Sequence, residues 1–357
     1  MNSQSLISQV KHNCNISDAN YWGYFSMCNL LLRLRELYFH EHDLDISVKV
    51  QKEDISGWIS DRESLWETLE DTDLKSLEIA GRSYDPFAID DINGILEKEN
   101  LLYGAGYGLL KKPIFFIGEI KSRHTMEDKN VWIVHNEICR ELSPPFAMSQ
   151  GQNIFIRTDI LTGYLYNKYL ELKTRSEKDP LRMAFEHFGC RYDSSEIKDI
   201  MEVLSGISDE ISRILIWHEV GEINERDGFG IWLDIVAASE DRLTEFRLRG
   251  IKDVISDTSP EGTLPSIVKN RDRGLLYFYT ALLDETRKTI FPEILDGVRQ
   301  FTEKDDWTAI EDSIKIGREK AKSLMSDILS LWSDTKDIKE IRKYLMESPV
   351  TACRLQK

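Results

Sequence analysis

The segment from residue 211 to residue 226, ISRILIWHEVGEINER, constrains the fold most, because polar side chains lie where a core helix needs apolar ones. Its aliphatic residues recur every three or four positions, which predicts a helix that packs against other helices. At ~100° per residue, His218, Glu222 and Glu225 fall on the same side as Ile211. A buried carboxylate or imidazole is costly unless it is paired, hydrogen-bonded or bound to a metal ion. The segment is therefore either a buried ion-pair helix or part of a functional site.

The composition is that of a globular chain with about two domains. Of its 357 residues, 41% are hydrophobic and 30% are charged, so each domain can bury its own core. The formal net charge is −16, with 16 basic against 24 acidic residues up to residue 157 and 30 against 38 after it. Because neither half is basic, the charge argues against binding to nucleic-acid phosphates.

Cysteine usage and hydropathy predict a cytoplasmic protein. The cysteines are widely spaced and form no C-x-x-C pair, which argues against a zinc ribbon and a disulfide framework. They are Cys14, Cys28, Cys139, Cys190 and Cys353. The first residues lack the apolar core of a signal peptide, and no run of 18 apolar residues exists that would span a membrane.

The first half of the chain predicts a small antiparallel sheet. Residues 113–121, PIFFIGEIK, form the strongest predicted strand, with residues 131–135 as its partner and a third strand at 153–157. Residues 103–108, YGAGYG, lack the spacing of a phosphate-binding loop and predict a hairpin loop. Residues 136–142 are expected to form a short helix.

An amphipathic helix is expected at about residues 19–42, where Ser17 or Asp18 can act as the N-cap. Arg35 projects between Leu31 and Phe39 on its apolar side. A buried guanidinium needs a carboxylate or an anion beside it, so Arg35 is a candidate pocket residue.

The second half predicts helices only. They are expected at about residues 159–173, 180–188, 196–205, 208–226, 230–248, 272–289, 291–301, 305–333 and 336–346. The fold class is therefore α+β and predominantly α-helical. We expect a mixed N-terminal domain at 1–157 and an all-α helical bundle at 158–357.

Helical bundles build metal sites from carboxylates and histidines that face inward from neighbouring helices. His218 and Glu222 are four residues apart and can reach one ion, and Glu225 continues the stripe. Glu186 and His187, on the predicted 180–188 helix, are candidates from a second helix. Such a set suits iron, manganese or zinc. The leading hypothesis is a metal-binding protein or metal-dependent enzyme, with oxidoreductase as the expected class.

Two alternatives stay open. The first is a metal-free binding or scaffold protein, in which Arg35 and Glu285 line a pocket for a small molecule or protein partner. The second is a metal-dependent nuclease. Glu119 and Lys121 share one face of the 113–121 strand, and restriction-type nucleases use such an E-x-K pair with an upstream acid, here Asp85.

Several segments together resemble a family of conserved bacterial proteins of unknown function. They are HNCNISDA, SYDPF, PIFFIGEI, LSPPFAM, NIFIRTDIL and WHEVGE. The resemblance covers most of the chain and implies an N-terminal and a C-terminal domain that meet near residue 160, in a bacterial cytosolic protein. It implies no activity, cofactor or catalytic residue.

Overall fold

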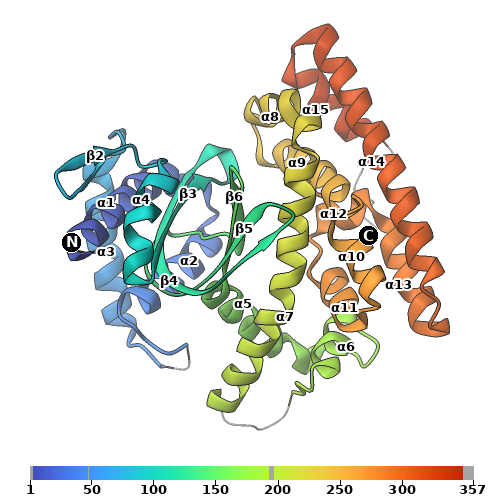
Figure 1. Cartoon of the computed structure of the whole chain (residues 1–357), viewed down its shortest axis with the longest axis horizontal. Coiled ribbons are helices and arrows are strands. Elements are labelled where there is room, and N and C mark those ends of the chain that lie inside the picture. Colours follow the sequence, from blue (N-terminus) through green and yellow to red (C-terminus); the bar gives the residue numbers. More distant parts are fainter. Residues whose placement is uncertain (1–2, 47, 193–196, 349–357) are drawn as a thin grey trace. The chain divides into compact units, whose positions relative to one another are not determined.

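The computed structural model describes residues 3–46, 48–192 and 197–348, and the chain divides into two compact units, Met1–Gly163 and Tyr164–Lys357 (Figure 1). The first unit combines helices with strands, and the elements described in the second are helical. The predicted α+β class with a predominance of helix is confirmed.

The N-terminal unit is built around a five-stranded mixed sheet in the order β3-β4-β5-β7-β6. Its strands are β3 (Leu101–Tyr107), β4 (Pro113–Met126), β5 (Lys129–Arg140), β6 (Ala147–Gln150) and β7 (Asn153–Arg157). β5 and β7 run parallel, and the other neighbouring pairs are antiparallel. A second, smaller antiparallel sheet pairs β1 (Leu77–Ile79) with β2 (Arg82–Tyr84). The strand at 153–157 matches its predicted bounds.

Two predictions for this sheet are wrong. Residues 136–140 continue strand β5 instead of forming a helix, because pairing with β4 overrides their local helical preference: Ile117 pairs with Cys139 and Phe116 with Arg140. The glycine-rich stretch is strand β3, not a loop. A Cβ atom at Gly104 would lie 2.1 Å from the Phe116 ring, so this glycine makes room for an aromatic side chain on the neighbouring strand.

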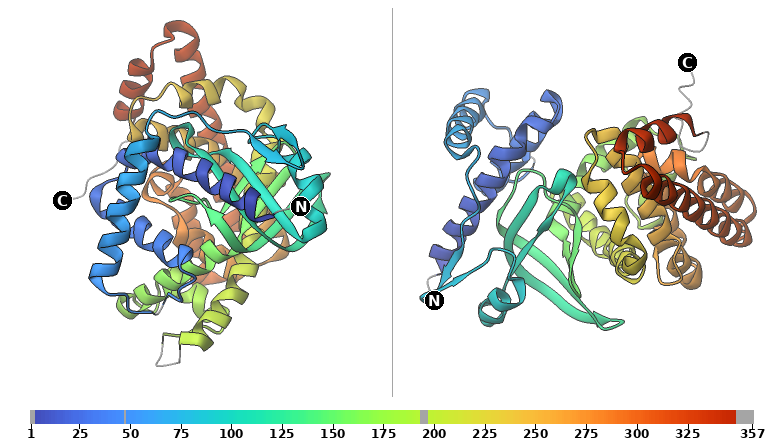
Figure 2. Two further views of the ribbon diagram at one scale, coloured as in Figure 1. Left: turned by 90° about the vertical axis from the view of Figure 1, so that its left-hand side faces the viewer. Right: turned by 90° about the horizontal axis from the view of Figure 1, so that it is seen from above.

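Helix α1 (Ser3–Tyr21) packs against β4 along one face of the sheet (Figure 2). The chain then turns through a short 3-10 segment into α2 (Met27–Glu41), so the single helix predicted at 19–42 is wrong. The sequence pattern does not predict α1, because some residues on its buried side are polar, such as Asn13 and Asp18. Helix α3 (Lys52–Leu69) packs on both α1 and α2, and α4 (Ile89–Leu96) covers β3.

Side-chain amides hold α1 to the chain beside β1. The Asn13 amide donates to the Lys75 carbonyl at 2.7 Å and accepts from the Lys75 backbone N–H at 2.8 Å. Gln9 makes the same two bonds to Glu78, in a more exposed position. The Asn13 side chain therefore makes the two hydrogen bonds with the Lys75 backbone that a neighbouring strand would otherwise make.

A buried ion cluster closes the end of β7. The Arg157 guanidinium donates to Glu137 at 2.9 Å and to Glu141 at 3.0 Å, and its carbon lies 4.3 Å from the centre of the Phe116 ring. Burial lowers the pKa of Arg157, but the two carboxylates outweigh burial, so the pKa rises and the guanidinium stays charged.

The boundary between the two units, after Gly163, falls within α5 (Thr158–Glu171), so the C-terminal unit begins partway along this helix. Its further helices are α6 (Pro180–His187), α7 (Ile197–Asn224), α8 (Gly230–Ala237), α9 (Arg242–Asp257), α10 (Thr263–Asn270), α11 (Arg273–Leu282), α12 (Glu285–Ile290), α13 (Pro292–Lys304), α14 (Thr308–Thr335) and α15 (Ile338–Glu347). The two helices predicted at 196–205 and 208–226 are one continuous helix, α7. It packs against α9, α10 and α11.

No helix among the described residues is long and apolar enough to cross a membrane. Three of the described cysteines, Cys14, Cys139 and Cys190, are buried free thiols, and Cys28 is exposed. Cys353 lies outside the described residues.

The Asn13 bonds give a direct stability test. Asn13→Ala leaves the Lys75 N–H and C=O without partners in a part-buried place, and an unsatisfied group that water cannot reach costs about 1–3 kcal/mol. We expect the variant to lose roughly 2–4 kcal/mol of unfolding free energy in urea. Gln9→Ala removes the same pair of bonds where water can replace them, so it is the matched control and should lose less than about 1 kcal/mol. Equal losses in the two variants would contradict this account.

Candidate functional site

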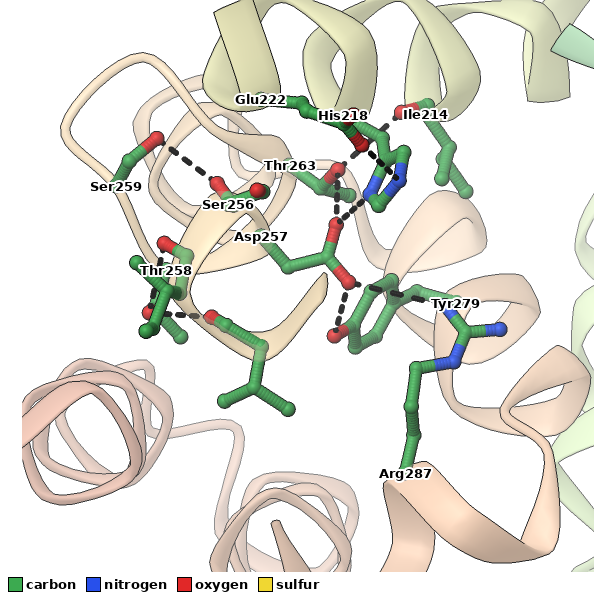
Figure 3. Close-up of polar contacts among 12 residues, drawn as sticks. Ile214, His218, Glu222, Ser256, Asp257, Thr258, Ser259, Thr263, Tyr279 and Arg287 are labelled. Carbon is green, nitrogen blue, oxygen red and sulfur yellow. Dashed lines mark hydrogen bonds and ion pairs between the residues drawn. The ribbon is translucent and has the colours of Figure 1, made fainter. Parts of the chain in front are cut away.

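Helices α7 and α9 face each other through a stripe of polar side chains in the C-terminal unit (Figure 3). α7 contributes His218 and Glu222, which are one turn apart as the sequence predicts. α9 contributes Asp253 and Asp257, also one turn apart. α7 is amphipathic along its length, so the same packing that buries Ile211 and Ile214 brings His218 and Glu222 to α9.

The Asp257 carboxylate lies at the centre of this stripe and is 1% exposed. Oδ1 lies 2.8 Å from Nδ1 of His218 and accepts a hydrogen bond from the Thr263 hydroxyl at 3.0 Å. Oδ2 accepts from the Tyr279 hydroxyl at 3.0 Å and lies 3.9 Å from the Arg287 guanidinium. Figure 3 shows Arg287 reaching this carboxylate from α12, on the other side from His218.

The His218–Asp257 contact is an ion pair. Burial favours the neutral imidazole, but the nearby Asp257 carboxylate outweighs burial and raises the pKa of His218 to about 10. Burial also opposes the charged form of Asp257, yet His218 and its hydrogen bond hold the pKa of that carboxyl below its usual range. At neutral pH, His218 is therefore a cation beside an anion.

The other ring nitrogen of His218 faces a second carboxylate. Nε2 lies 3.9 Å from Oε2 of Glu222, whose same oxygen lies 2.6 Å from the Lys252 ammonium. Burial alone would raise the pKa of Glu222, and Lys252 lowers it. Asp253 has no hydrogen bond or ion pair to another of the described residues, and burial raises its pKa.

His218, Glu222 and Asp253 have the geometry of an incomplete metal site. Their ligand atoms lie within 4.8 Å of one another, and they form the one such group found in the described part of the chain. Zinc–ligand bonds of about 2.0–2.2 Å place two ligand atoms of the same ion at most about 4.4 Å apart. The three side chains would therefore have to move only slightly toward one another to bind an ion. The Nδ1 contact with Asp257 is the carboxylate–histidine pairing that orients metal-ligating imidazoles.

The structure keeps the other predicted metal ligands apart from this group. Glu225 forms ion pairs with Arg318 and Lys322 of α14, because it lies almost a full turn beyond Glu222. Glu186 lies 3.6 Å from Arg182 on its own helix, and the His187 ring lies beside Gly274 of α11. Glu225, Glu186 and His187 belong to no metal-binding group in the described residues.

The predicted pocket residues are on the surface. Arg35 is exposed, as is Leu31 one turn before it, and the Arg35 guanidinium lies 4.6 Å from the centre of the Phe39 ring. The Glu285 side chain is 87% exposed and pairs with Lys288 on the same helix. Both side chains are therefore solvent-exposed in the described residues, and a pocket lined by them stays a prediction.

Two residues of the nuclease hypothesis, Glu119 and Asp85, have local partners of their own. Glu119 lies 3.8 Å from His135 on the neighbouring strand and accepts a hydrogen bond from Asn136. Asp85 is exposed and caps its own turn by accepting from the Phe87 N–H. Neither Glu119 nor Asp85 belongs to a group of three or more metal-binding side chains in the part of the chain that the structure describes. The nuclease alternative stays a prediction.

Sequence reasoning missed Lys252, Asp253 and Asp257, which lie on the helix that packs against α7. The spacing of Asp253 and Asp257 was a usable signal, since four residues place both on one face. Gly221 is the point on α7 where the end of α9 comes close. A Cβ atom there would lie 2.4 Å from the Ser256 carbonyl oxygen, so this glycine lets α7 approach the end of α9.

The close approach at Gly221 can be tested by substitution. Glycine to alanine inside a helix ordinarily stabilises by roughly 0.5–1 kcal/mol. Gly221→Ala should instead destabilise by about 1–3 kcal/mol, because the new methyl group pushes α7 from α9. Gly206, in the same helix, has open space around it and is the matched control, so Gly206→Ala should stabilise. Urea unfolding measures both, and a stabilising effect at Gly221 would refute the packing.

The ion pair predicts how stability depends on pH. Folding raises the pKa of His218 from 6.5 to about 10, so the pair stabilises fully below pH 6.5 and loses this effect as pH rises toward 10. In chelator-treated protein, the difference in unfolding free energy between wild type and His218→Gln should shrink by about 2–4 kcal/mol from pH 6.5 to 9. A difference that stays constant over this range would mean that the pair is absent.

Comparison with protein families gives two matches. Residues 5–157 match the model described as the N-terminal domain of a family of unknown function (DUF6866), and residues 162–348 match the model of its C-terminal domain. No curated protein and no solved structure matches the chain. The family descriptions name no activity or ligand, so the geometry of the site is the basis for a function.

Proposed function

The chain belongs to the DUF6866 family of unknown function, and we propose that it is a metal-dependent enzyme whose divalent ion is held by His218, Glu222 and Asp253. The carrying observation is that the ligand atoms of these three side chains lie within 4.8 Å of one another. Asp253 supports the proposal independently, since among the described residues this half-buried carboxylate has no hydrogen-bond or ion-pair partner.

The donor set fits a borderline transition metal. One imidazole and two carboxylates suit manganese, iron or zinc, and three protein ligands leave coordination positions for water or substrate. Bound iron or manganese would supply redox chemistry, and zinc would supply Lewis-acid chemistry. Asp257 fixes the imidazole through Nδ1, so that Nε2 is the nitrogen that faces Glu222.

A metal-free function is the second candidate, and the Lys252 ammonium favours it. This ammonium lies 2.6 Å from Glu222, where it already neutralises one of the metal ligands. A protonated His218 cannot coordinate through Nε2, so an ion has to displace that proton. Without a metal, His218, Lys252 and the carboxylates form a closed ion cluster that stabilises a binding or scaffold protein.

The metal proposal predicts one tightly bound ion per chain. Chelator-treated protein should bind one equivalent of zinc, manganese or ferrous iron, measured by calorimetric titration and by elemental analysis after desalting. Glu222→Gln and Asp253→Asn should each weaken binding by roughly 100-fold or more, since even residues that only orient a ligand contribute about 10–100-fold.

Glu225→Gln is the matched control. It removes a carboxylate that lies just past the end of α7, three residues after Glu222. The partners of Glu225 are Arg318 and Lys322. This variant should keep wild-type metal stoichiometry and affinity. If wild type binds no equivalent of any of the three metals, the proposal fails and the metal-free candidate remains. If Glu225→Gln loses the metal as Glu222→Gln does, the assigned ligand set is wrong.

A further inference from the structure

An open cleft of about 430 Å³ lies in the N-terminal unit, at the end of α1. Its volume is within the range of small-molecule sites, roughly 300–1,000 Å³. Tyr21 and Tyr24 line it, and their ring centres lie 5.9 Å apart with planes tilted by 39°. Asp73 and Leu110 also line the cleft.

The lining offers hydrogen-bond acceptors and few donors. The hydroxyl groups of Ser17, Tyr21 and Thr72 donate to the backbone carbonyls of Pro113, Lys111 and Leu69. The Asn20 amide donates to the Ile16 carbonyl, and its oxygen accepts from the Asp71 N–H. These hydroxyl donors are therefore already in use, while the hydroxyl oxygens can still accept hydrogen bonds.

The only charged side chain in the lining is a carboxylate. Asp73 is exposed and has no hydrogen bond or ion pair to any of the described residues. The nearby Lys112 ammonium is buried and committed to Asp18 at 2.7 Å. Leu110 and the adjacent Lys111 both adopt positive φ angles, 55° and 58°. Such strain in non-glycine residues gathers at ligand-binding segments.

We propose that this cleft binds a small organic cation through an alkylammonium group. Asp73 supplies the counter-charge, and the faces of Tyr21 and Tyr24 supply cation–π contacts, which is how aromatic cages recognise substituted ammonium ions. The tyrosine and serine oxygens accept hydrogen bonds from the N–H or hydroxyl groups of the ligand. An anionic ligand would meet a carboxylate and no free cation in this lining. The site is independent of the metal centre, which belongs to the other unit.

The test uses choline and butylammonium as cationic probes and dimethylbutanol, the neutral carbon isostere of choline. Binding is measured by saturation-transfer NMR and by titration calorimetry on the full chain. Both cations should bind, and the isostere should bind at least about tenfold more weakly because it lacks the charge. Asp73→Asn and Tyr24→Ala should each weaken choline binding by about fivefold or more, whereas Tyr24→Phe should keep it because the ring remains.

Asp71→Asn is the matched control, because Asp71 is an exposed aspartate of the same segment that does not line the cleft. Circular dichroism checks that each variant folds. The proposal is overturned if neither cation binds, if the neutral isostere binds as well as choline, or if Asp73→Asn and Asp71→Asn have the same effect. The proposal is supported if both cations bind and if binding is lost only when the lining carboxylate or the aromatic ring is changed.

Discussion

The buried carboxylate of Asp257 is the group on which the arrangement of the C-terminal site depends. A fully buried carboxylate is stable only when its lone pairs are satisfied, and here Thr263, Tyr279 and His218 satisfy them. These three come from three different helices, so the carboxylate ties α7, α10 and α11 to the end of α9. Arg287 adds a cation from α12. The position of His218 is thus a consequence of how the helices pack.

The same interaction fixes what the site can do. Because Asp257 takes Nδ1 of His218, only Nε2 is left for a proton or a metal ion, and these two compete for it. The raised pKa of His218 favours the proton, and Glu222 and Asp253 favour the metal. Lys252 also favours the protonated, metal-free form, because its ammonium already pairs with an oxygen of Glu222. Under the proposed function, the site therefore exchanges between a metal-free ion cluster and a metal-bound form.

Sequence patterns predict those features that depend on one element at a time. The α+β class, the long helices and the stripe of His218 and Glu222 all follow from periodicity within a single segment. Partners on a second helix do not. Asp253 and Asp257 take part only because α9 packs against α7, and Glu225 is excluded only because Arg318 reaches it from α14.

Buried polar residues explain the larger errors. Asn13 and Asp18 lie inside the N-terminal unit, where they satisfy backbone groups of other segments, and their polarity hides a helix that runs through them. Gly104 looks like a turn residue, although it serves to admit the ring of Phe116 on the next strand. For these residues a long-range contact decides the outcome. Arg35 differs, because it is exposed like its apolar neighbour Leu31, so the apolar pattern around it does not indicate burial.

The most direct test of the central claim is pulsed electron paramagnetic resonance of the manganese-loaded protein, which detects nitrogen bound to the ion. The account predicts modulation from one imidazole nitrogen in wild type, and its loss in His218→Gln. A spectrum without nitrogen coupling, or one that His218→Gln leaves unchanged, would contradict the assignment of His218 as a metal ligand.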